Sequence, residues 1–104
     1  MKKIVNGVIY DTEKATLIGE SSEGYKGDFR HWEAGLYVTP RSKRYFIAGA
    51  GGPMTRFAQS VGQNSWEGGA DLIPMTREEA LEWAEKYVDT AIVEHYFGDV
   101  LEEA

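Results

Sequence analysis

The longest periodic pattern of apolar and polar positions in this chain lies at residues 73–88. Apolar residues recur there at the three- and four-residue spacing of one helix face: Ala80, Trp83, Ala84, Tyr87 and Val88. Thr76 followed by Glu79 is a capping-box pattern, in which each side chain bonds the backbone N–H of the other residue. The pattern predicts an amphipathic helix whose apolar face packs on the rest of the protein.

The N-terminal half has the shorter alternation that is typical of strands. Two apolar runs, Ile4-Val5 and Val8-Ile9-Tyr10, flank Asn6-Gly7, a strong signal for a tight hairpin turn. Further strand-like segments, separated by polar or glycine-containing stretches, occur at 15–20, 29–39 and 44–48. Residues 1–50 are therefore expected to form an antiparallel sheet of about five short strands.

The C-terminal half divides into three parts. Residues 51–72 are rich in glycine without clear periodicity and are expected to form loops. Residues 73–98 hold the main helix and a shorter second helix, and residues 99–104 are expected to form an acidic tail. An antiparallel sheet needs cover on one face, and the Trp83 face of the helix supplies it. The sequence predicts a single α+β domain over 1–104, with two layers and one or two C-terminal helices on an N-terminal sheet.

Charge is distributed unevenly along the chain. The net charge is −6, but residues 78–104 carry nine carboxylates against one lysine, whereas the first 77 residues are slightly basic. Four of these carboxylates have spacings of 4, 3 and 4 and share one side of the main helix: Glu78, Glu82, Glu85 and Asp89. Such a row favours a basic protein partner and repels nucleic acid and anionic lipid. It is the candidate partner-binding face; the alternative is an ordinary solvated helix face.

Several kinds of chemistry have no support in the sequence. There is no cysteine, which excludes disulfides, thiolate metal ligands and cysteine nucleophiles. His31 and His95 are the only histidines, and neither has the spacing of a metal site. The glycines of 49–53 lack the Lys-Ser/Thr ending of a phosphate-binding loop. We therefore expect a non-enzymatic protein with no cofactor and no metal. A pocket around His31 that shifted its pKa would instead favour a small enzyme.

Two absences bear on location. The absence of cysteine fits a cytoplasmic protein. No apolar run approaches the roughly 20 residues that span a bilayer. The expected location is the cytoplasm, with no membrane association.

A basic and aromatic hairpin tip supplies the alternative function. Arg41, Lys43 and Arg44 stand next to Tyr45, and side chains of these kinds bind phosphates and stack on bases. The tip has few cations, and the acidic C-terminal part opposes binding. A nucleic-acid-associated accessory protein is therefore the second hypothesis.

Two stretches carry a resemblance to known proteins. The opening Lys2-Lys3-Ile4-Val5-Asn6-Gly7 and the segment Glu79-Ala80-Leu81-Glu82-Trp83-Ala84-Glu85 resemble a group of small proteins of bacterial plasmids, conjugative elements and phages. Proteins of this size and charge from such sources include anti-CRISPR inhibitors. The likeness covers the first 20 residues and the main helix and carries no catalytic motif. It implies a protein that inhibits a host protein or ribonucleoprotein complex by steric block or nucleic-acid mimicry. Separately, we expect the chain to be a monomer or a homodimer.

Overall fold

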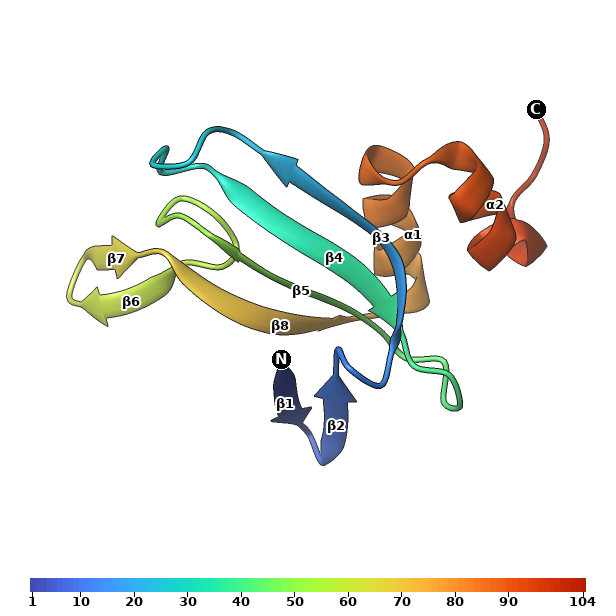
Figure 1. Cartoon of the computed structure of the whole chain (residues 1–104), viewed down its shortest axis with the longest axis horizontal. Helices are drawn as coiled ribbons and strands as arrows, with labels where there is room; N and C mark the ends of the chain where they lie inside the picture. The colour runs from blue at the N-terminus through green and yellow to red at the C-terminus, as the bar shows by residue number, and fades with distance from the viewer.

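A four-stranded antiparallel sheet is the centre of the protein in the computed structural model, which describes residues 1–104 (Figure 1). Its strands, in spatial order, are β3 (Thr16–Glu23), β4 (Trp32–Val38), β5 (Tyr45–Gly51) and β8 (Gly69–Met75). Two small hairpins flank it, formed by β1 (Lys2–Val5) with β2 (Val8–Asp11) and by β6 (Gln59–Gly62) with β7 (Ser65–Glu67). The chain ends in α1 (Arg77–Tyr87), α2 (Thr90–Phe97) and the short 3-10 helix η1 (Gly98–Val100). The predicted α+β fold class is confirmed.

Helix α1 covers one face of the sheet. Its Ala80, Trp83 and Ala84 are buried against Leu36 of β4 and Ile47 of β5, which are both fully buried. The predicted capping box is present. The Thr76 hydroxyl accepts a hydrogen bond from the Glu79 N–H at 3.1 Å, and the Glu79 carboxylate accepts one from the Thr76 N–H at 2.9 Å. The helix therefore begins at a fixed point directly after β8.

Helix α2 is held against α1 and the same face of the sheet. Phe97 is fully buried and stacks on Tyr45 of β5, with 5.5 Å between ring centroids. Arg77 at the start of α1 lies over the Phe97 ring and forms an ion pair with Asp99. Asp89 begins α2, because its carboxylate accepts the Ala91 N–H at 3.2 Å. These contacts fix both helices relative to the sheet.

The β1–β2 hairpin covers part of the opposite face. Tyr10 packs edge-on against Phe46, and the two form a small second core with Leu72. Asn6 and Gly7 have φ values of 50° and 77°, as the predicted tight turn requires. The hairpin is a partial third layer beyond the two that the sequence predicts.

The division of the C-terminal half differs from the prediction. Residues 51–72 were expected to be loop, but they contain β6, β7 and most of β8, and the helical region begins at Arg77 instead of residue 73. The sequence did not predict β8 because it contains Pro74, and proline is rare in central strands. Strand β8 lies at the edge of the sheet, where proline is tolerated. In the acidic tail, Asp99 belongs to η1 and is paired with Arg77, so only residues 101–104 lack regular structure.

Replacing Trp83 with alanine is predicted to lower the free energy of unfolding by roughly 3–5 kcal/mol, because removal of the buried indole leaves a cavity beneath α1. The measurement is chemical denaturation followed by circular dichroism. Trp66→Ala is the control, because Trp66 on β7 is 61% exposed and its removal should change stability little. Equal stabilities for the two variants would contradict this packing.

Candidate functional site

The predicted acidic row lies on the solvent side of α1. Glu78, Glu82 and Glu85 are exposed, as is Asp89 just beyond the helix. None of the four belongs to either of the two ion pairs of the chain, Lys3–Asp71 and Arg77–Asp99. The carboxylate of Asp89 is already bonded to the first turn of α2, so three of the four predicted residues are free for a partner. We call Glu78, Glu82 and Glu85 the acidic stripe.

The predicted basic tip is only partly available. Arg41, Lys43 and Arg44 are exposed in the β4–β5 connection. Tyr45, however, is 8% exposed and stacked on Phe97, so its ring is not available to a base. The prediction that Tyr45 stacks on a base is wrong. Tyr45 is the first residue of a central strand, and its side chain packs on Phe97 of α2.

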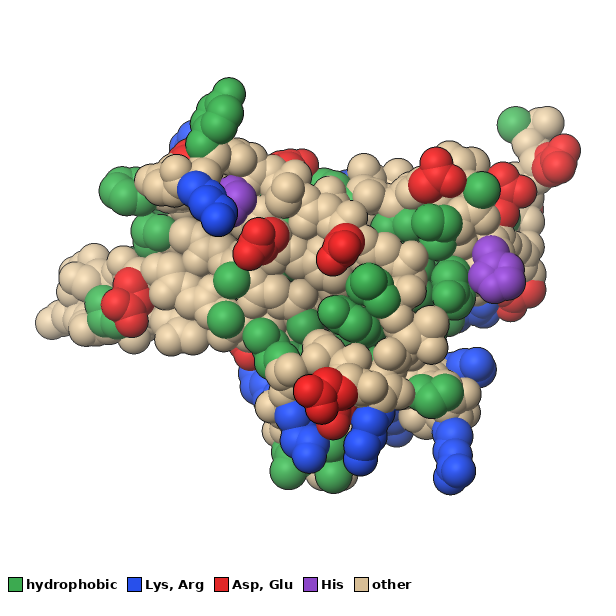
Figure 2. All heavy atoms as spheres, in the orientation of Figure 1, with side chains coloured by type: hydrophobic (Ala, Val, Ile, Leu, Met, Phe, Trp, Pro, Cys, Tyr) green, Lys and Arg blue, Asp and Glu red, His purple; other side chains and the backbone are tan.

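The basic surface also extends beyond the tip. Lys14 of the β2–β3 connection lies with Arg41 around a shallow hollow of about 310 Å³. Figure 2 shows lysine and arginine side chains gathered over the β1–β2 hairpin and the β4–β5 connection. The sequence could not reveal this grouping, because the β2–β3 and β4–β5 connections meet only when the sheet forms.

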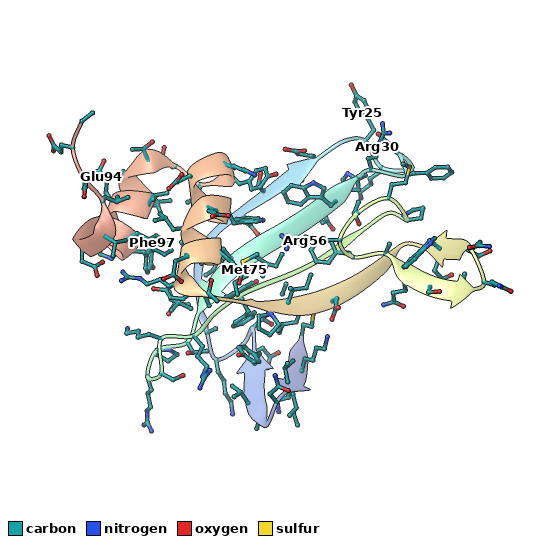
Figure 3. The ribbon with its side chains drawn as sticks, turned by 180° about the vertical axis from the view of Figure 1, so that it is seen from behind. Tyr25, Arg30, Arg56, Met75, Glu94 and Phe97 are labelled. Carbon is teal, nitrogen blue, oxygen red and sulfur yellow. The ribbon has the colours of Figure 1, made fainter.

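A cleft of about 440 Å³ lies between α1, the sheet and the β5–β6 connection. Trp32, Trp83 and Tyr87 form an aromatic wall in it, with ring centroids 5.0–6.2 Å apart. Charges of both signs stand around it: Arg30, Arg56, Lys86, Glu23, Glu79 and Glu82. Figure 3 shows Arg30 and Arg56 on the loop side and Met75 beside α1. An apolar group of a ligand or partner would fit here, but the balanced charges select neither anion nor cation.

Sequence reasoning missed this cleft. Its lining residues come from β3, β4, β5, β8, two connections and α1, so no local pattern joins them. The only signal was the number of tryptophan and tyrosine residues, which did not show where they meet.

Three carboxyl groups have altered acidities. A hydrogen bond from the Thr76 backbone lowers the pKa of Glu79, and the hydrogen bond from Arg77 lowers the pKa of Asp99. Burial opposes ionisation of Asp71, but hydrogen bonds from Lys3 and the Leu72 N–H outweigh it, and its pKa is also lowered. All three groups stabilise helix ends or strand contacts. Their lowered pKa values are therefore explained by these structural contacts.

Neither histidine lies in a group of side chains that could act as a catalytic or metal site. The Nδ1 atom of His31 lies 3.0 Å from the Glu23 carbonyl oxygen and 3.3 Å from that of Gly24, where it ties the β3–β4 connection together. His95 is exposed beside the Tyr96 ring. No three histidine, aspartate or glutamate side chains are grouped as metal ligands. Neither α1 nor α2 is long and apolar enough to cross a membrane.

No protein-family model, curated protein or solved structure matches this chain significantly. The resemblance to small proteins of mobile elements therefore stays a prediction, and function must be inferred from the surfaces themselves.

Stability is predicted to fall as the pH drops below about 4, the ordinary range of carboxyl groups. The pKa of Glu79 is depressed in the folded protein. Its stabilising effect is thus present above the unfolded pKa and is lost as the pH falls through the folded one. Glu79→Gln keeps an oxygen that can accept the Thr76 N–H but does not titrate, so it should make stability less dependent on pH. Urea denaturation at pH 7 and pH 3 measures this.

The control for that experiment is Glu20→Gln, because the Glu20 side chain is exposed and belongs to neither ion pair. It should keep the pH dependence of the wild type. An equal loss of pH dependence in both variants would show that the capping box is not its source.

Proposed function

We propose that this chain is a non-enzymatic binding protein that attaches its acidic stripe to a basic surface of a host protein or ribonucleoprotein complex and so inhibits it. The observation that supports the proposal is the row of exposed carboxylates without ion-pair partners on α1. Neighbouring carboxylates on one side of a helix are roughly 5–6 Å apart. A fixed row of this kind can enter a groove that is built for a phosphate backbone.

Rigidity of the helix supports this function further. The capping box holds the first turn of α1, and Trp83 anchors its middle in the core. The helix backbone that carries the carboxylates is therefore ordered before a partner arrives, which reduces the entropy cost of binding. Their like charges destabilise an isolated helix by a few tenths of a kcal/mol per pair, and a basic partner would relieve that repulsion.

Replacing Glu78, Glu82 and Glu85 with lysine is predicted to abolish partner binding while the fold is kept, since all three residues are exposed. The measurement is capture of partners by tagged protein from a nuclease-treated lysate of a host with active defence systems. Wild-type protein should retain a stoichiometric protein complex, and the triple variant should lose it.

A matched control reverses three other exposed glutamates, Glu13, Glu67 and Glu103, and changes the net charge by the same amount. It should keep the partner, because these residues lie outside α1. Retention of the complex by the α1 triple variant, or its loss in the control, would contradict the proposal.

Binding of nucleic acid is the second candidate function, favoured by the position of Lys14 beside Arg41. A gel shift with wild-type protein should then appear at low salt and disappear at moderate salt. Lys14→Glu and Arg41→Glu should each weaken it, and Lys26→Glu, on the β3–β4 connection, serves as the control. Absence of a shift at low salt would exclude this function.

A further inference from the structure

The backbone hydrogen bonds at the two ends of the β4–β5 pair fix the pattern of the whole sheet. The Thr39 N–H donates to the Arg44 carbonyl at 2.9 Å, and the Gly52 N–H donates to the His31 carbonyl at 2.8 Å. Opposed residues of an antiparallel pair alternate between bonded and non-bonded positions. The backbone N–H and C=O groups of odd-numbered β4 residues therefore form hydrogen bonds with β5, and those of even-numbered β4 residues form hydrogen bonds with β3.

This alternation determines which backbone groups of β3 are free. Ala34 faces Ser21 and Trp32 faces Glu23, so Ser21 and Glu23 use their N–H and C=O groups within the sheet. Glu20 and Ser22 direct theirs to the other side, where no strand lies. No side-chain or loop hydrogen bond involves their backbone, and both residues are exposed. The outer edge of β3 is thus open at these two residues.

The opposite edge of the sheet is closed. By the same alternation, the even-numbered residues of β8 face outward. The Leu72 N–H donates to the Asp71 carboxylate at 2.8 Å, and its carbonyl lies 3.5 Å from the Lys3 ammonium. Pro74 has no N–H to offer. Charged side chains and proline are the means by which proteins prevent edge-to-edge pairing, and β8 has both while β3 lacks the proline.

We propose that the open edge of β3 receives an extended, basic segment of the partner protein as a fifth strand of the sheet. Strand addition of this kind takes its affinity from main-chain hydrogen bonds and its specificity from alternate side chains. Glu20 and Ser22 supply the donors and acceptors.

Charge defines the segment. In the β3–β4 register Glu20 faces Gly35 and Ser22 faces Glu33, so Glu20 and Glu33 are diagonal neighbours on one face. Both are exposed and neither belongs to an ion pair. Figure 2 shows carboxylate side chains on this face of the sheet. Lysine or arginine at alternate positions of an added strand would lie beside them.

A second copy of this chain fits the edge poorly. Pairing of two β3 strands through Glu20 and Ser22 would place the two Glu20 side chains opposite or diagonal to each other on one face, and neighbouring like charges destabilise a sheet. The charges therefore favour a basic segment over self-association.

The open edge lies next to the C-terminal end of α1, and the choice of a basic partner rests on the proposed function. Val88 at the end of α1 lies against Gly19 of β3, where an added Cβ would be only 2.9 Å from a Val88 methyl group. Helix α1, which carries the acidic stripe, therefore ends beside the open edge, whereas Glu20 and Glu33 lie on the face of the sheet opposite α1.

The test uses a synthetic peptide of alternating lysine and threonine and follows amide hydrogen exchange by NMR. In the free protein the amides of Glu20 and Ser22 should exchange rapidly, whereas those of Ser21 and Glu23 should be protected. Addition of the peptide should slow exchange at Glu20 and Ser22. A peptide with glutamate in place of lysine should not bind.

Ser22→Pro removes one outward donor but no bond of the sheet, as Pro74 does on β8, so the fold should persist. It should weaken peptide binding about tenfold, whereas Ser22→Ala, which keeps the N–H, should bind as the wild type does. If the proline variant fails to fold, N-methylation of the peptide along its pairing edge supplies the same test with unaltered protein.

Equal affinity for Ser22→Pro or for the methylated peptide, absence of peptide binding, or binding without slower exchange at Glu20 and Ser22 would each overturn the proposal. A dimer of this chain in sedimentation, with slow amide exchange at Glu20 and Ser22 in the absence of peptide, would also overturn it. None of these measurements involves the acidic stripe. Failure of the stripe variants with a protected edge would therefore refute only the proposed function, and the reverse result would refute only the added strand.

Discussion

Packing of α1 on β4 and β5 is the interaction on which the rest of the structure depends. Burial of Ala80, Trp83 and Ala84 turns the glutamates of the helix toward solvent, because residues on one side of a helix leave the other side free. It also forms one wall of the aromatic cleft and carries Val88 onto β3. The acidic stripe, the cleft and the contact of Val88 with β3 are consequences of a single contact between helix and sheet.

The sequence predicts those elements whose signals are local. The Thr76–Glu79 capping box, the Asn6-Gly7 turn and the apolar face of α1 all depend on residues a few positions apart, and each is present. Strand β8 escaped prediction because Pro74 is acceptable only on an edge, and the edge is a property of the assembled sheet. The β6–β7 hairpin escaped because its residues are all exposed and have no alternating pattern.

The candidate sites follow the same division. The acidic stripe comes from spacing within one helix, so its exposure could be predicted from the sequence alone. The burial of Tyr45 depends on Phe97, which lies 52 positions further along the chain, and the position of Lys14 beside Arg41 depends on how two connections meet. Contacts between distant segments have no counterpart in local periodicity, so the sequence could not reveal the cleft or the full basic surface.

The two edges of the sheet differ in how they are protected against pairing. An exposed edge strand invites pairing with any extended chain, and β8 avoids this through Asp71, Lys3 and Pro74. β3 relies on a bulge between Leu17 and Gly19 and on its glutamates. Charge repels acidic strands and copies of the same chain, but it attracts basic ones. The residues that prevent aggregation at this edge are thus the ones that would select its partner.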